Sequence, residues 1–159
     1  MDDPTEQSQW RALHQLLARM DGEIAQIYTE RQVTGLKPSF VLELLRLHAK
    51  GPMTITELAE SVGRTHSALS QKVSAMRTAG LVRTAPGTDA RSKKVALTAK
   101  AEGIVELLAA EWRATEAAIT ELEAELPYPM TKIVRDVEEA LARKSFHDRI
   151  AEKLEHRQP

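Results

Sequence analysis

Apolar residues recur along most of this chain at steps of three and four, the spacing of amphipathic helices. The pattern predicts a long helix from Thr5 to about Gln32 and a second from residue 99 to about Leu126. Pro127 and Pro129 break the pattern, and a last helix is expected from Met130 to roughly His156. The three apolar stripes are Trp10, Leu13, Leu17, Met20, Ile24 and Ile27; then Ile104, Leu107, Leu108, Trp112, Thr115, Ile119, Leu122 and Leu126; then Ile133, Val134, Val137, Leu141, Phe146, Ile150 and Leu154.

A further helix is predicted to begin at Pro38, because proline suits the first position of a helix. The segment Lys50-Gly51-Pro52 ends it. Its apolar residues give it a face that needs burial beneath the neighbouring elements, and they are Phe40, Val41, Leu44, Leu45 and Leu47.

The middle of the chain predicts two short helices joined by a tight turn. Thr54 and Glu57 have the spacing of a capping box at the start of a helix over 55–62, and Met53 and Leu58 have that of a hydrophobic staple. Gly63 ends this helix. Thr65 then caps a second helix that stops at Gly80, and its inward positions are Leu69, Val73 and Met76.

The outward face of the second helix is polar, with Lys72 and Arg77 at its flanks and no acidic residue from Thr65 to Thr88. Its short hydrogen-bonding side chains are His66, Ser67, Ser70, Gln71 and Ser74. Glutamine can bind adenine with two hydrogen bonds, and serine can contact bases or phosphates. Helix, turn and helix at this spacing predict a helix-turn-helix whose second helix enters a major groove. Taken alone, the helix also fits a polar surface helix with no ligand.

A two-stranded hairpin is predicted next, with strands over 81–84 and 93–97 and turns at Pro86-Gly87 and Thr88-Asp89. Its tip projects the cations Arg91, Lys93 and Lys94. Asp89 precedes Arg91 by two residues and is placed to orient its guanidinium, which suits a narrow minor groove. The alternative is a solvated basic hairpin that binds no ligand. Because the hairpin directly follows the predicted helix-turn-helix, a winged helix-turn-helix explains it better.

These residues resemble the MarR family of bacterial transcription regulators. The resemblance lies in two sequence blocks, the helix-turn-helix TITELAESVGRTHSALSQKVSAMRTAGLVR and the wing DARSKKVALT. The flanking helices also match the family in placement and length. Ala101 stands where the family usually has a glycine three residues after the threonine. The resemblance implies a mainly α fold. It also implies that residues 1–159 form a single MarR-like domain. Its winged helix-turn-helix, three helices plus a two-stranded β-wing, spans 38–98, and its long dimerisation helices span 5–35 and 99–156.

The charge distribution agrees with a DNA-binding head. The chain has a net charge of −1, but seven cations and one acid between Gly63 and Lys94 give that stretch +6, which leaves −7 for the rest. The DNA-binding residues expected are Arg64, Thr65, His66, Ser67, Ser70, Gln71, Ser74, Arg77, Asp89, Arg91, Lys93 and Lys94.

Several other kinds of chemistry are not expected. The chain has no cysteine, which excludes disulfides and the cysteine-based peroxide sensing of one branch of the resembled family. The histidines are scattered, and no pair has metal-ligand spacing with an acid: they are His14, His48, His66, His147 and His156. No nucleotide-binding loop or catalytic motif is present, so we expect no enzyme, no cofactor and no metal. No apolar run approaches the roughly 20 residues of a membrane span, and a cytoplasmic protein is expected.

The apolar stripes of the terminal helices require a covering. A monomeric helical bundle is one solution. A two-fold dimer is favoured, because an inverted-repeat operator in double-stranded DNA needs two recognition helices roughly 34–36 Å apart. The resemblance implies the same arrangement, with the terminal helices intertwined.

The resemblance also implies a small, often aromatic or phenolic effector between the dimer helices and the winged lobe. Its expected lining is His14, Leu17, Phe40, Leu44, Leu108 and Trp112, and each of these also fits plain core. The function expected is a homodimeric, sequence-specific regulator, either repressor or activator. The alternative is an adaptor or architectural protein that uses the winged fold to bind a protein partner.

Overall fold

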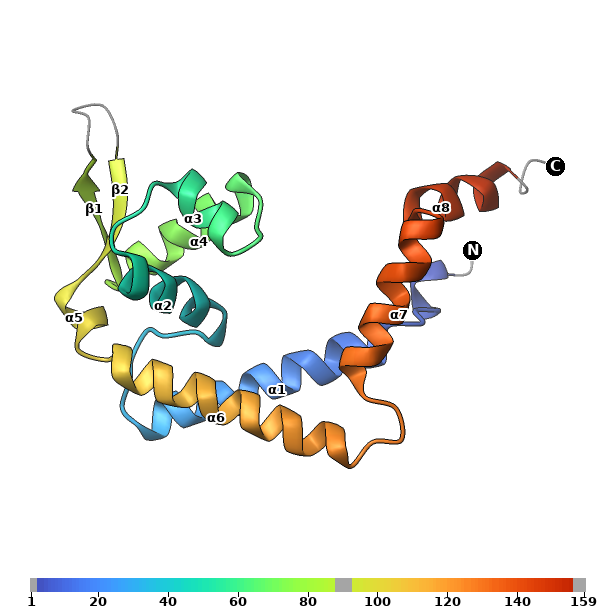
Figure 1. Ribbon diagram of the computed structural model, residues 1–159, viewed down its shortest axis with the longest axis horizontal. Coiled ribbons are helices and arrows are strands. Elements are labelled where there is room, and N and C mark those ends of the chain that lie inside the picture. The colour runs from blue at the N-terminus through green and yellow to red at the C-terminus, as the bar shows by residue number, and fades with distance from the viewer. Residues whose placement is uncertain (1–2, 88–92, 156–159) are drawn as a thin grey trace. The chain divides into compact units, whose positions relative to one another are not determined.

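The computed structural model describes residues 3–87 and 93–155, and within them it is mainly helical with one two-stranded sheet, as predicted (Figure 1). The chain divides into two compact units, 1–112 and 113–159. The first unit contains the helix-turn-helix and the hairpin. No helix in the described ranges has the length and apolar character needed to cross a membrane.

The first long helix, α1, spans Arg11–Glu30, so the prediction that it begins at Thr5 is wrong. Residues Pro4–Glu6 form the short 3-10 turn η1 instead. The Asp3 carboxylate accepts hydrogen bonds from the Thr5 backbone N–H at 2.8 Å and from its hydroxyl at 2.7 Å, which stabilises this separate turn. Arg11 donates from Nη2 to the carbonyls of Thr5 at 2.7 Å and Glu6 at 3.1 Å, and so fastens the turn to the start of α1.

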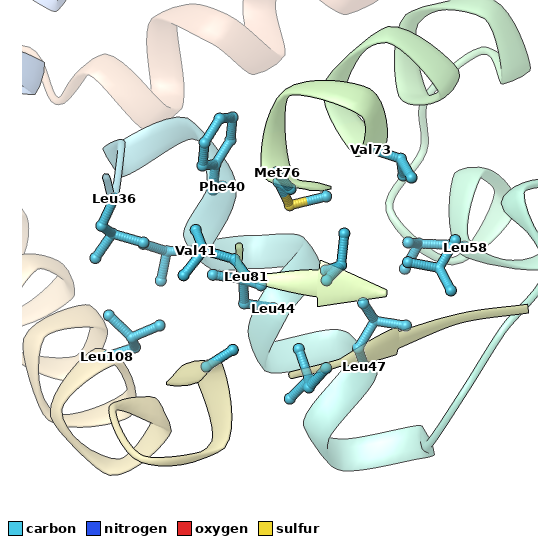
Figure 2. Packing of buried hydrophobic residues seen from close by; sticks show 14 of the residues in the cluster. Leu36, Phe40, Val41, Leu44, Leu47, Leu58, Val73, Met76, Leu81 and Leu108 are labelled. Carbon is cyan, nitrogen blue, oxygen red and sulfur yellow. The ribbon is translucent and has the colours of Figure 1, made fainter. Parts of the chain in front are cut away.

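The core of the first unit is built around α2, Val41–Lys50, which follows the 3-10 turn η2, Pro38–Phe40, as the proline predicted. Figure 2 shows Phe40, Val41 and Leu44 among side chains contributed by the other elements. The helices α3, Ile55–Ser61, and α4, His66–Thr78, add Leu58, Leu69, Val73 and Met76 to this cluster. Leu81 and Leu108 complete it, and both are fully buried.

The hairpin pairs β1, Val82–Pro86, with β2, Lys93–Leu97, in antiparallel register with Val82 opposite Leu97 and Pro86 opposite Lys93. The predicted first strand, 81–84, was too short. Pro86 lacks an N–H group, but a proline is tolerated at the end of an edge strand, so the pairing continues through it. Val95 also pairs with Met53 on its other side, through N···O distances of 2.6 and 3.1 Å. The segment before α3 therefore extends the sheet by a single bridge.

The predicted helix from residue 99 to Leu126 is interrupted. The short helix α5 spans Ala99–Glu102, and α6 spans Val105–Ala124. The Thr98 hydroxyl caps α5 by accepting from the Ala101 N–H at 3.3 Å. The N–H of Ile104 bonds to the carbonyl of Ala101, a spacing of three residues, so the α-helical pattern is broken there before α6 begins.

The predicted last helix is also two helices, α7 over Met130–Arg143 and α8 over Phe146–Glu155. Lys144 has an extended backbone, with φ −154° and ψ 117°. Ser145 then acts as the cap of α8, because its hydroxyl accepts from the Asp148 N–H at 3.1 Å. Both helices have apolar residues at helical spacing, but the step from Leu141 to Phe146 is five residues, which marks the break between them.

Tyr28, near the end of α1, is 2% exposed and lies in the core of the first unit. Its hydroxyl donates a hydrogen bond of 2.5 Å to the Glu111 carboxylate on α6. Burial raises the pKa of the Tyr28 phenol well above its usual value, and the hydrogen bond and negative charge of Glu111 act in the same direction. The neutral phenol is therefore the form that the folded chain requires.

We expect Tyr28→Phe to lower the free energy of unfolding by on the order of 2 kcal/mol at neutral pH, because it removes a hydrogen bond to a charged group. The folded pKa of Tyr28 is raised, so its contribution is complete below the unfolded pKa of about 10 and declines by about 1.4 kcal/mol per pH unit above it. Urea denaturation between pH 8 and 11 should show this decline in the wild type more strongly than in the variant. Tyr128→Phe is the control, since Tyr128 is 70% exposed; equal pH profiles for the wild type and Tyr28→Phe would contradict the assignment.

Candidate nucleic-acid interface

The start of α3 and the turn from α3 to α4 are formed by local interactions that the sequence predicted. Thr54 and Glu57 form the expected capping box, in which Glu57 Oε2 accepts from the Thr54 N–H at 2.8 Å and from its hydroxyl at 3.0 Å. The hydrogen bond from the Thr54 backbone N–H is the main reason why the pKa of the Glu57 carboxyl is lowered. The bond from the Thr54 hydroxyl and the nearby Lys94 ammonium act in the same direction. Gly63 has φ +65°, a left-handed conformation that glycine adopts at no steric cost. The chain can therefore leave α3 sharply, and α4 begins at His66, three residues after Gly63.

The helix α4 is oriented by its buried stripe. Leu69, Val73 and Met76 are each no more than 1% exposed, as predicted. The Thr65 hydroxyl caps the helix by accepting from the Ala68 N–H at 3.3 Å. The side chains predicted to face DNA are exposed, except for the partly exposed Ser70: they are Arg64, Thr65, His66, Ser67, Gln71, Ser74 and Arg77.

The outer face of α4 is not used in holding the fold together. Within the residues that the structure describes, the side chains of Ser70, Gln71 and Arg77 have no hydrogen-bond or ion-pair partner. Their donors and acceptors therefore point to solvent and can exchange water for another polar surface. A row of such groups on a helix with a buried opposite face is the arrangement needed to bind base edges and phosphates.

The C-terminal end of α4 is held by residues that the sequence analysis missed. Thr98 donates from its hydroxyl to the Gly80 carbonyl at 2.7 Å, and Lys100 donates from Nζ to the Ala79 carbonyl at 3.0 Å. A cation at the last carbonyls of a helix is favourable because these carbonyls have no partner within the helix. Since Lys100 lies 21 residues from Ala79, sequence spacing contains no signal for this contact.

Lys72 differs from its expected role. Its place in the sequence predicted a cation at the flank of the DNA-facing surface, but its ammonium is turned toward the protein. Lys72 Nζ donates to Glu43 Oε1 on α2 at 2.8 Å and to the Ser39 carbonyl at 2.8 Å. Its positive charge is therefore balanced internally. The signal for Glu43 was present in the sequence: it lies three residues after Phe40 and four before Leu47, on the buried face of α2.

The wing adds cations beside α4. Arg83 on β1 and Lys93 on β2 are exposed, while Lys94 is partly exposed. Asp89 and Arg91, which were predicted to act together at the tip, lie outside the described residues. The exposed cations of α4 and of the two strands belong to elements that pack on one another in the same unit (Figure 1).

The six residues predicted to line an effector site fall into two groups. Phe40, Leu44 and Leu108 are buried in the core cluster, in which Figure 2 shows all three. His14, Leu17 and Trp112 are exposed, and Trp112 is 38% exposed. The structure therefore brings three of them together as core, while the role of all six as an effector site stays a prediction.

Among the described residues, no group of three or more histidine, aspartate or glutamate side chains is arranged to hold a metal ion. His48 lies 3.1 Å from Glu102, between α2 and α5, and His147 lies 3.2 Å from its neighbour Asp148. Both are exposed pairs of two residues, too few for a structural metal site.

Comparison with known proteins gives the same fold. A family model described as HVO_A0114 matches residues 41–105, the region from α2 to the start of α6. The Staphylococcus aureus protein MepR, solved in complex with DNA, has a TM-score of 0.60 and 16% identity over 86% of this chain and 98% of its own. The Mycobacterium tuberculosis transcriptional regulator MosR, also solved with DNA, has a TM-score of 0.57 and 22% identity over 87% and 99%. No curated protein matches the chain in sequence.

A MarR protein from Peptoclostridium difficile is similar as well, with a TM-score of 0.57 and 18% identity over 92% of this chain and 96% of its own. At these identities the likeness establishes the fold. The chain has the winged helix-turn-helix fold of the MarR regulators, as the resemblance implied. The similar structures that are named by their function are transcriptional regulators.

Proposed function

We propose that this chain is a sequence-specific DNA-binding transcriptional regulator that acts as a homodimer on an inverted-repeat operator, as a repressor that a small ligand releases. The observation that supports it best is the outer face of α4. That face presents Gln71, Ser74 and Arg77 to solvent from a helix whose opposite face is fully buried. The exposed cations Arg83 and Lys93 of the neighbouring hairpin extend the surface toward the flanking phosphates.

We expect Gln71→Ala and Arg77→Ala to weaken DNA binding in different ways. Loss of Gln71 should relax the preference at one base position, by about 1–3 kcal/mol of discrimination, because a glutamine can recognise adenine through two hydrogen bonds. Loss of Arg77 should weaken binding to all sequences alike and reduce the slope of log K against log salt by about 0.9, because one phosphate contact is lost. Binding-site selection on random duplexes, followed by salt titrations of each variant, measures both effects. Equal loss on all sequences for Gln71→Ala would remove it from the base-contacting residues.

The dimer is supported by the exposed apolar faces of α7 and α8. Val137 and Leu141 are each 37% exposed, and Phe146, Ile150 and Leu154 are more exposed still. Exposed apolar residues occur on both α7 and α8, and a protein in water does not usually leave such a surface uncovered. A second copy of the same helices would bury it, and the second recognition helix would add the avidity of a second half-site.

We expect the wild type to sediment at twice the chain mass of 17.7 kDa and Val137→Asp/Leu141→Asp to sediment as a single copy. The introduced carboxylates would be desolvated in the interface, which opposes association. Glu138→Gln, on the same helix, is the matched control and should leave the dimer unchanged. A wild type that sediments as one copy would instead favour the adaptor alternative, in which this apolar surface binds a different protein.

The effector part of the proposal rests on the resemblance. A ligand that prefers a splayed dimer would shift the population away from the spacing that fits DNA. We expect hydroxybenzoates to release the DNA in a gel-shift titration and Trp112→Ala to need a higher concentration, because Trp112 is the exposed aromatic of the expected lining. Trp10→Ala is the control. No release at any concentration of the phenolates would count against a phenolic effector.

A further inference from the structure

Glu43 is a carboxylate on the apolar face of α2, in the first turn of the helix, and its side chain is 0% exposed. Among the described residues it is the one charged residue that is fully buried. Its Oε1 is paired with Lys72 Nζ at 2.8 Å, and its Oε2 has no hydrogen-bond partner there. Burying a carboxylate whose second oxygen has no hydrogen-bond partner has an unfavourable desolvation free energy. Its presence in the core therefore needs a reason other than packing.

Lys72 meets this carboxylate from the inner side of α4. It lies three residues after Leu69 and four before Met76, so it belongs to the inward stripe of the helix. Its second bond, to the Ser39 carbonyl at 2.8 Å, fastens it to the start of the same helical segment that contains Glu43. Two directed bonds thus join the middle of α4 to η2 and α2.

Apolar contacts alone restrict the rotation of α4 about its axis less than these two hydrogen bonds do. The hydrophobic effect is non-directional, so the contacts of Leu69, Val73 and Met76 tolerate a small rotation of the helix about its axis. A hydrogen-bonded ion pair does not tolerate it, because both distances and angles must be kept. One residue of helix corresponds to about 100° of rotation, so a fraction of that step already changes which side chains face outward.

We propose that Glu43 is a positioning residue for DNA recognition: by holding Lys72, it fixes the rotation of α4 and so determines where Gln71 and Ser74 point. This inference rests on the proposed DNA-binding function. It assigns the Lys72 ammonium to contacts within the fold, so Lys72 contributes nothing to the phosphate contacts, although it lies beside Gln71 in the sequence. Stability alone does not require the pair, because well-packed apolar residues of similar volume often replace buried ion pairs without loss.

The test is the double variant Glu43→Leu/Lys72→Met, which replaces the pair by apolar side chains and leaves no charge unpaired. Its urea midpoint should equal or exceed that of the wild type. Its affinity for the selected operator should fall about tenfold or more, while its affinity for a scrambled duplex and its salt slope stay unchanged. Glu102→Gln is the matched control, because it breaks the exposed pair of α2 with α5 and should alter neither quantity.

Two results would overturn the inference. Full discrimination between operator and scrambled duplex in the double variant would show that the pair does not position α4. A salt slope reduced by about one would show that Lys72 contacts a phosphate in the complex.

A measurement without DNA separates this inference from the proposed function. The chain has no cysteine, so cysteines introduced at the exposed Ala49 on α2 and Ser74 on α4 can each take a spin label. The distance distribution between the labels should be narrow with the native pair and broader or shifted in the double variant. An unchanged distribution overturns the inference. If the wild type binds no duplex of any composition, the proposed function fails, and this distribution alone decides whether Glu43 positions α4.

Discussion

The inner face of α4 combines two kinds of contact that act differently on the helix. Leu69, Val73 and Met76 hold it against the core through burial, which supplies most of the free energy and little direction. Thr98 and Lys100 bind the carbonyls of Gly80 and Ala79 just after its last residue, and Glu43 and Ser39 hold Lys72 near its middle. Because these bonds come from three different parts of the chain, the outer face of α4 has a defined orientation without using any of its own side chains.

This arrangement explains how a chain with a net charge of −1 can present a cationic surface. The cations near α4 have separate tasks. Lys72 and Lys100 are hydrogen-bonded within the fold, while the exposed Arg77, Arg83 and Lys93 have no hydrogen-bond or ion-pair partner among the described residues. A count of charges along the sequence cannot separate the two groups, because the separation depends on partners elsewhere in the chain. The exposed cations are the ones that can neutralise phosphate.

The features that were predictable from the sequence are those with a local cause. The capping box of Thr54 and Glu57, the cap at Thr65 and the turn at Gly63 each depend on residues within four positions of one another. The inward stripe of α4 followed from helical periodicity. The predicted start of α1 at Thr5 was wrong. The apolar periodicity begins only at Trp10, and it contains no information on the separate turn that Asp3 and Arg11 stabilise.

The features that were not predictable depend on distant partners or on continuity of the apolar pattern. Glu43 and Lys72 are 29 residues apart, and only the folded chain shows that they meet. At Gly103 the apolar residues Ala101, Ile104 and Leu108 keep steps of three and four, so the pattern continues as if the helix were unbroken. At Ser145 the step from Leu141 to Phe146 is five residues, so the sequence did contain a signal of that break. The tip of the wing, where Asp89 and Arg91 were predicted to act, lies outside the described residues.

The bridge between Met53 and Val95 has a mechanical consequence. Val95 belongs to β2, and Met53 immediately precedes the cap of α3, so two backbone hydrogen bonds couple the hairpin to the entrance of the first short helix. A force applied at the hairpin would be transmitted through this coupling to α3 rather than absorbed by a loose linker. A tilt of the hairpin independent of α3 would therefore have to break these two hydrogen bonds.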